Sequence, residues 1–322
     1  MSGDRSGDRA RLSGDGARSP ARVERGSTCK RLPDGRATAS DGVNIAVHDL
    51  GGTGAPVVFA HATGFHGLVW QQAGALLAQD FHAIGLDHRG HGNSALPPDR
   101  DYDWRGFGRD ILAVIDHLGL VQPFGVGHSA GGTAMLLAEQ ARPGTFRALF
   151  LFEPVLVRAD PPLGRDPANW LAEGARRRRE VFDSREEAYA TYASKPPFMT
   201  WVPEVLAAYV DYGFGDRADG TVSLKCRPDD EAVVYERATE HDAFVHLGEI
   251  SCPVMLVAGA ANDSFGPGTD IAALADRLAD GRSENLPGVG HFGPMEDPPA
   301  VAALIRRFFR GVMTGESATP PD

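Results

Sequence analysis

The sequence predicts an α/β fold in which a mostly parallel sheet alternates with helices. The first observation is a set of short apolar runs, such as residues 56–60 (PVVFA), which are typical of strands buried on both faces. The second is that helical stretches separate these runs, as in βαβ units. The third is that residues 155–245 break the alternation with helical segments rich in Arg, Glu, Trp and Tyr. We therefore expect a sheet core with an inserted helical cap.

The elements of the core follow one another in this alternating order. Residues 43–50 alternate like a strand, and the glycines of the turn at 51–54 lead into the buried run at 56–60. Further strands are expected at residues 82–86, 124–126, 148–152, 254–258 and 284–286. Helices are expected at residues 68–77, 104–118, 131–141, 271–278 and 299–309. No buried strand is expected in the cap.

The chain divides into two parts of one core domain, the cap and two tails. Residues 1–27 contain repeated Ser, Gly and Asp and few apolar side chains, so they are expected to form a flexible tail. Residues 28–154 form the first part of the core, 155–245 the cap, 246–312 the second part of the core, and 313–322 a short tail. No internal repeat is evident.

Composition excludes several classes of protein. A net charge of −11 over 322 residues argues against a nucleic-acid partner, which would need clustered Lys and Arg in surplus. No apolar run approaches the roughly 20 residues of a membrane span, and the N-terminus has no apolar signal segment. The three cysteines Cys29, Cys226 and Cys252 are widely spaced, so reduced thiols and a cytoplasmic location are expected. A homo-oligomer is left open.

One segment carries the chemistry. Residues 127–131 read Gly-His-Ser-Ala-Gly and lie between an expected strand and an expected helix, which is the context of a nucleophile elbow. Such a turn presents the hydroxyl of Ser129 at the carboxyl edge of the sheet. Because a serine needs a base to take its proton, a histidine and an orienting carboxylate should follow in the chain. His291 lies on a loop after the last strand, and Asp263 lies on the loop after the strand at 254–258.

Four separated motifs together resemble the α/β-hydrolase superfamily over about residues 36–312. They are HATGF at 61–65, DHRGHGNS at 87–94, the elbow at Ser129, and Gly290-His291 with Glu296 and Pro298 behind it. The resemblance implies a sheet of about eight strands, a cap inserted after the sixth strand and a Ser-His-acid triad. By alignment to the family, the backbone amides of Thr63 and Ala130 form the oxyanion hole, with Gly64 as an alternative to Thr63.

The resemblance leaves two positions for the acid. The family's usual loop reads Gly-x-x-Asp, whereas Asn262 is the third residue after Gly259 here and Asp263 the fourth, which a one-residue insertion explains. Asp263 is therefore the expected acid. The alternative is Glu153, directly after the sixth strand, where some members of the superfamily place it. Either carboxylate would hold His291 in the correct tautomer.

The substrate pocket is expected beneath the cap. Phe65, Trp70 and Phe292 on the core loops, together with His128 beside the nucleophile, are the candidates for its wall from the core. Some of the cap's aromatic residues should also contact the substrate. These aromatic residues are Trp170, Phe182, Tyr189, Tyr192, Phe198, Trp201, Tyr209, Tyr212 and Phe214.

Two charged or metal-binding alternatives are less favoured. The run Arg-Arg-Arg-Arg at 176–179 could clamp an anion, but four consecutive residues point all round a helix, so a solvated helix surface is expected. The histidines are scattered over separate motifs and do not have the tight spacing of zinc ligands, so we expect no metal and no cofactor.

The sequence thus predicts a cofactor-free serine hydrolase of a small, apolar carboxylic ester or lactone, acting on a small-molecule substrate through an acyl-enzyme. A carbon-carbon bond hydrolase with the same triad is the alternative enzyme. A catalytically silent binding protein is the alternative outside enzymes, because a fold does not fix a function.

Overall fold

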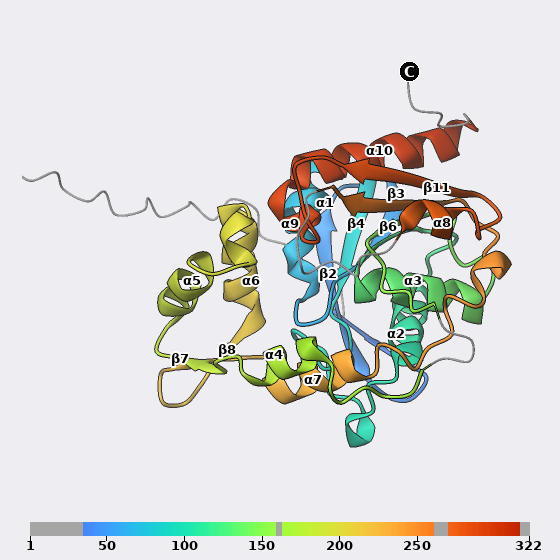
Figure 1. Ribbon diagram of the computed structural model, residues 1–322. Coiled ribbons are helices and arrows are strands. Elements are labelled where there is room, and N and C mark those ends of the chain that lie inside the picture. The colour runs from blue at the N-terminus through green and yellow to red at the C-terminus, as the bar shows by residue number, and fades with distance from the viewer. Residues whose placement is uncertain (1–34, 159–162, 261–269, 316–322) are drawn as a thin grey trace, which may run out of the picture.

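The computed structural model describes residues 35–158, 163–260 and 270–315. Its core is an eight-stranded sheet in the order β1-β2-β4-β3-β5-β6-β10-β11 (Figure 1). The strands are β1 (Arg36–Thr38), β2 (Asn44–Gly51), β3 (Ala55–Ala60), β4 (Phe81–Leu86), β5 (Phe124–His128), β6 (Leu149–Phe152), β10 (Val254–Gly259) and β11 (Gly281–Leu286). The pairs β1–β2 and β2–β4 are antiparallel, and every other pair is parallel. The expected mostly parallel α/β sheet of about eight strands is confirmed.

Helices cover both faces of this sheet. On one face lie α1 and α10, and on the other lie α2, α3 and α8 (Figure 1). Side chains alternate along a strand, so successive residues of β3 point to opposite faces of the sheet. Val57 packs toward α1 and α10, and Val58 packs toward α2 and α3. The helices are α1 (Gln71–Leu77), α2 (Trp104–His117), α3 (Ala130–Ala141), α8 (Ile271–Ala275) and α10 (Pro298–Thr314).

Short elements complete the core. A 3-10 turn, η1 (Gly67–Trp70), precedes α1, so the expected helix at 68–77 is present as two pieces. The last helix continues to Thr314, beyond the start of the expected tail at residue 313, and its Val312 and Met313 pack against the core. The other short elements are η2 (Pro98–Arg100), η4 (Leu247–Glu249) and α9 (Gly293–Glu296). Among the described residues, none of the helices combines the length and apolar character needed to cross a membrane.

The chain between β6 and β10 forms the cap, which lies to the left of and below the sheet in Figure 1. It contains α4 (Trp170–Arg176), α5 (Arg185–Ala193), η3 (Phe198–Thr200), α6 (Pro203–Gly213) and α7 (Pro228–Glu236). It also contains a three-stranded antiparallel sheet, β7-β9-β8, made of β7 (Val181–Phe182), β8 (Phe214–Asp216) and β9 (Val222–Leu224).

This small sheet corrects the expectation that the cap has no buried strand. Phe182, Phe214 and Val222 are buried in the same apolar cluster as the side chains of α5 and α6. Each strand is only two or three residues long and pairs antiparallel with its neighbour. Such short strands have no continuous apolar run and therefore leave almost no trace in a hydrophobicity pattern.

Candidate active site

Ser129 occupies the turn between β5 and α3. Its backbone φ of 53° and ψ of −119° lie outside the regions that a non-glycine residue usually adopts. The turn is held in place because the Ser129 amide donates to the carbonyl of Phe152 on β6 at 2.9 Å. Strain that the surrounding structure enforces in this way is typical of functional positions.

Close approach of the backbone explains the glycines of the elbow. A Cβ built on Gly127 would lie 2.6 Å from the carbonyl oxygen of Gly131, and one on Gly131 would lie 2.4 Å from the carbonyl oxygen of Ala60. Because both obstacles are backbone atoms, no side-chain movement would relieve them. The Gly-x-Ser-x-Gly spacing is therefore required by packing.

His291 and Glu153 form a buried pair. Nδ1 of His291 lies 2.7 Å from Oε2 of Glu153, and the two side chains are 8% and 10% exposed. The second oxygen of Glu153, Oε1, accepts from the Gly259 amide at 2.9 Å. Glu153 itself has a φ of 44°, and its amide donates to the carbonyl of Val257 at 2.8 Å. The ends of β6 and β10 thus fix this carboxylate next to the imidazole.

This arrangement bears on the choice of acid. Glu153, the alternative acid in the sequence, is in hydrogen-bond contact with His291. Asp263 lies outside the described residues, so its assignment as the acid stays a prediction. The pairing of Glu153 depends on the approach of two strand ends that are about a hundred residues apart in the chain.

His128 and Trp70, both expected in the pocket wall, do not line the cavity between the core and the cap to which Ser129 and His291 belong. The His128 side chain is fully buried, and its Nε2 donates to the backbone carbonyl of His291 at 2.8 Å. Burial, reinforced by the nearby His291, holds the pKa of His128 well below its usual range, so its ring is neutral. Trp70 is fully buried, with its ring 5.3 Å from that of Phe59, because η1 directs it into the core.

The two candidate oxyanion amides are those of Ala130, which follows Ser129 in the chain, and of Thr63. Ala130 is the first residue of α3, where helical N–H groups have no partner within the helix. Thr63 follows β3 and lines the cavity with Ser129. Neither the Thr63 nor the Ala130 amide donates to another of the residues that the structure describes. These are the donors that a developing negative charge near Ser129 could use.

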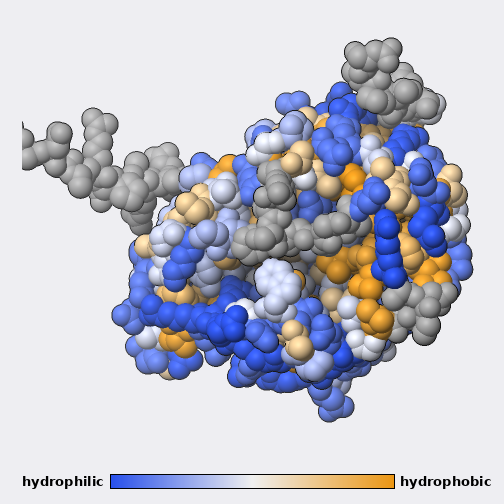
Figure 2. Space-filling view, viewed as in Figure 1, coloured by the Kyte–Doolittle hydropathy of each residue, from blue (hydrophilic) through white to orange (hydrophobic). Residues whose placement is uncertain are grey.

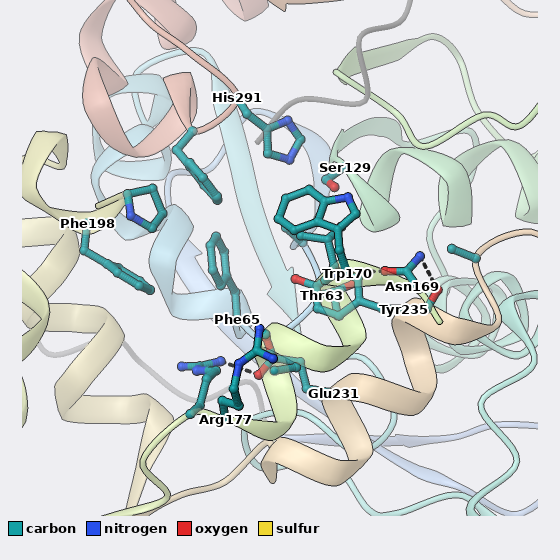
Figure 3. A pocket seen from close by; sticks show the side chains of 18 of the residues that line it. Thr63, Phe65, Ser129, Asn169, Trp170, Arg177, Phe198, Glu231, Tyr235 and His291 are labelled. Carbon is teal, nitrogen blue, oxygen red and sulfur yellow. Dashed lines mark hydrogen bonds and ion pairs between the residues drawn. The ribbon is translucent and has the colours of Figure 1, made fainter. Parts of the chain in front are cut away.

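A cavity of about 680 Å³ lies between the core and the cap. Ser129, His291 and Thr63 line it, as do the predicted wall residues Phe65 and Phe292. Figure 3 places Ser129 and His291 at one end of the cavity and Glu231 and Arg177 at the other, with Phe65 between them. The cap contributes four of the aromatic residues considered in the sequence, namely Trp170, Phe182, Tyr192 and Phe198.

The sequence does not reveal the charged residues that line the cap end of the cavity. It predicts a solvated helix surface for residues 176–179, but α4 ends at Arg176, and the next turn directs Arg178 inward. The side chain of Arg178 is 17% exposed and forms an ion pair with Glu231. Lys195, Glu231 and Tyr235 also line the cavity. Locating the end of α4 in the sequence would have indicated that Arg178 lies outside the helix and can turn inward.

The loop that carries His291 is joined to the cap. One carboxylate oxygen of Glu296 accepts from the Gly290 amide at 2.7 Å, and the other accepts from the Thr200 hydroxyl at 2.7 Å. The amide of Val202 also donates to the carbonyl of Met295 at 3.0 Å. Glu296 therefore connects η3 of the cap directly to the residue before His291.

Comparisons with known proteins agree with this architecture. A sequence profile of the family described as "Alpha/beta hydrolase family" matches residues 57–304. The chain is 30% identical to a non-heme chloroperoxidase from Burkholderia pyrrocinia, covering 79% of this chain and 91% of that protein. It is 28% identical to 3-oxoadipate enol-lactonase 2 from Acinetobacter baylyi (strain ATCC 33305 / BD413 / ADP1), covering 78% and 89%.

A similar fold occurs in the crystal structure of E-2-(acetamidomethylene)succinate hydrolase. The TM-score is 0.70 at 19% sequence identity, covering 85% of this chain and 98% of that one. At this identity the likeness concerns the fold. The profile match extends over most of the chain and includes Ser129, Glu153 and His291. The chain therefore belongs to the alpha/beta hydrolase family.

Proposed function

We propose that this hydrolase cleaves a small carboxylic ester or lactone through an acyl-enzyme on Ser129. The observation that carries the proposal is that a strained Ser129 and His291, which is paired with the buried Glu153, line one cavity. The similarity to an enol-lactonase supports the choice of an oxygen ester. Aromatic walls such as Phe65 and Phe198 favour an apolar portion in the substrate.

The proposed reaction begins when Oγ of Ser129 attacks the substrate carbonyl. Nε2 of His291 takes the hydroxyl proton, while the proton on Nδ1 stays hydrogen bonded to Glu153, which stabilises the imidazolium. The Thr63 and Ala130 amides hold the negative oxygen of the tetrahedral intermediate, and a donor of this kind is worth about 3 kcal/mol of barrier. His291 then returns the proton to the leaving alcohol oxygen.

The second half of the reaction releases the acyl group. A water loses a proton to His291 as its oxygen attacks the acyl carbonyl. The tetrahedral intermediate collapses, the acid product leaves, and the proton returns from His291 to Oγ of Ser129. A lactone passes through the same steps, but its alcohol stays attached to the acid product. No cofactor takes part in these steps.

The test is covalent labelling of the full chain with a fluorophosphonate probe, read by mass spectrometry. We expect the label on Ser129 and a loss of both labelling and p-nitrophenyl ester hydrolysis in Ser129→Ala. Ser251→Ala is the matched control, since Ser251 is exposed and does not line the cavity. An unlabelled Ser129 in a folded protein would refute the nucleophile and favour a silent binding protein.

A second measurement separates the two enzymatic alternatives. We expect short p-nitrophenyl esters or small lactones to be turned over faster than a vinylogous diketone, which is a carbon-carbon bond substrate. The opposite order, with Ser129 still labelled, would keep the serine nucleophile and replace the ester by a carbon-carbon bond.

A further inference from the structure

The end of the cavity away from Ser129 contains a fixed cation. Arg178 donates to the hydroxyls of Tyr192 at 3.0 Å and Tyr209 at 2.5 Å, and it forms an ion pair with Glu231. Burial opposes the charge of its guanidinium, but Glu231 and the two tyrosines outweigh that effect and raise the pKa of Arg178 well above its ordinary value. Glu231 in turn packs against Gly64, which follows the candidate oxyanion residue Thr63. Arg178 is therefore held in one orientation before any substrate binds.

The hydrogen bonds of Arg178 leave a donor available on the cavity wall. A tyrosine hydroxyl that accepts a hydrogen bond still has its own hydrogen to donate. Tyr192 lines the cavity, and within the described part of the chain its hydroxyl has no acceptor for that hydrogen. The neighbouring guanidinium withdraws electron density from this oxygen and strengthens the donor.

The charges along the cavity wall are unbalanced. Four cationic side chains line it, those of Arg177, Arg178, Arg179 and Lys195, against the single carboxylate of Glu231. The guanidinium of Arg179 donates to both carboxylate oxygens of Glu187. Arg177 is largely exposed and forms an ion pair with Glu173. Lys195 follows α5 at the edge of the cavity and forms no ion pair with the residues that the structure describes. Among these four cations, Lys195 is therefore the one whose charge no described carboxylate balances.

We propose that the substrate carries a carboxylate, which binds at this end of the cavity to Lys195, the Tyr192 hydroxyl and Arg178. This inference rests on the proposed ester or lactone hydrolysis and specifies its substrate class. An apolar spacer contacts Phe65, which lies between Ser129 and Glu231 in Figure 3, and Phe198, while the ester carbonyl lies at Ser129. A wholly apolar ligand would desolvate Lys195 and the Tyr192 hydroxyl without replacing their hydrogen bonds, which is unfavourable.

The kinetic test uses pairs of esters that differ only in this charge. Mono-p-nitrophenyl esters of dicarboxylic acids are compared with the same esters whose free carboxylate is capped as a methyl ester. A second arm places the carboxylate on the alcohol side, using acetate esters of hydroxy acids and their methyl-capped forms. We expect kcat/KM to be at least about tenfold higher for the anionic member in one arm, as expected for a hydrogen bond to a charged group.

Lys195→Glu tests the site without disturbing the buried network of Arg178. It should lower kcat/KM for the anionic ester by about tenfold or more, and the loss for the capped ester should be clearly smaller. Arg217→Glu is the matched control, because it makes the same change of charge on the cap outside the cavity lining. Raising the salt concentration from about 0.1 M to about 1 M shortens the Debye length from about 10 Å to about 3 Å. This change should reduce the ratio of kcat/KM between the anionic and the capped ester.

A binding measurement keeps this test separate from the proposed chemistry. Ser129→Ala should bind the intact anionic ester more tightly than the capped ester by calorimetry, and adding Lys195→Glu should remove the difference. The carboxylate site is refuted if anionic and capped esters bind and react equally, even where hydrolysis itself occurs. Loss of hydrolysis with the binding preference retained would instead refute only the proposed reaction.

Discussion

Oε2 of Glu153 and Nδ1 of His291 lie 2.7 Å apart, with the carboxylate supplied by the end of β6 and the imidazole by the loop after β11. A hydrogen bond in this position fixes which nitrogen of the imidazole carries the proton and which one can act as a base. Glu153 is therefore the carboxylate that we expect to act on His291 in the proposed triad.

Glu153→Gln should lower kcat about a thousandfold or more, because a neutral amide can stabilise the wrong tautomer and does not stabilise the imidazolium. Asp263→Asn should lower kcat by less than about tenfold on the same scale. Steady-state kinetics with a p-nitrophenyl ester, alongside thermal unfolding of both variants, measures the difference. A larger loss in Asp263→Asn than in Glu153→Gln would assign the acid to Asp263.

Gly64→Ala should displace the proposed oxyanion amide of the preceding residue, Thr63, and so lower activity. Gly64 has a φ of +80°, and a Cβ there would lie 2.6 Å from Oε1 of Glu231, whose carboxylate Arg178 holds in place. We expect kcat to fall about tenfold or more with a smaller change in KM, because a displaced donor weakens the transition state more than the bound substrate. Gly248→Ala is the control, since its added Cβ would lie no closer than 3.6 Å to a neighbour. Equal kcat values in the two variants would contradict the prediction.

Buried histidines should make the protein sensitive to acid. Burial lowers the pKa of His66 and His241 to about 4 and that of His88 to about 3. In the unfolded chain these histidines take up a proton near pH 6.5, whereas in the folded protein they stay neutral down to about pH 4. Their contribution to the free energy of unfolding is therefore fully present above pH 6.5 and is lost as the pH falls toward about 4. Each such histidine should remove about 1.4 kcal/mol of unfolding free energy per pH unit within this window.

His241→Phe isolates one of these contributions. The ring of His241 stacks on Trp104 at 5.1 Å, and neither ring nitrogen has a partner among the described residues, so phenylalanine keeps the packing. Urea unfolding at several pH values should show a shallower loss of stability below pH 6.5, by about one proton. His117→Gln, at an exposed position, serves as the control for the loss of one histidine. An unaltered slope in His241→Phe would show that this histidine is not neutral in the folded protein.

Trp170→Ala should affect substrate binding and leave the fold intact. Trp170 begins α4 and lines the cavity, yet it is 58% exposed (Figure 3). Loss of its contact should raise KM by about tenfold, within the range of a hydrophobic contact, while the melting temperature stays close to that of the parent protein. Met199→Ala, also exposed on the cap but outside the cavity lining, serves as the comparison. An unchanged KM would place Trp170 outside the substrate path.

The core of the fold could be predicted because its signals are local. The run at 56–60 and the glycines around Ser129 specify a buried strand and a tight turn without reference to the rest of the chain. The cap is different, since its two-residue and three-residue strands form only by pairing with one another. Its outer surface over α4, α7 and β7 is mainly hydrophilic (Figure 2), which agrees with the charged composition of that segment.

The parts of the candidate site that follow directly from the order of strands and loops along the chain could be predicted. Ser129 and His291 follow strands in the expected sequence and meet at one cavity. The pairing of Glu153 depends on where β6 ends relative to β10 and the His291 loop, which is a relationship in space. The inward orientation of Arg178 likewise depends on α4 ending at Arg176, and a run of four arginines does not reveal that end.

The carboxylate of Glu296 couples the cap to the loop that carries His291. Because its two oxygens connect Thr200 of the cap to the amide of Gly290, an outward movement of η3 would break one of these two hydrogen bonds. The cap therefore cannot separate from the core at η3 without losing a contact to this loop.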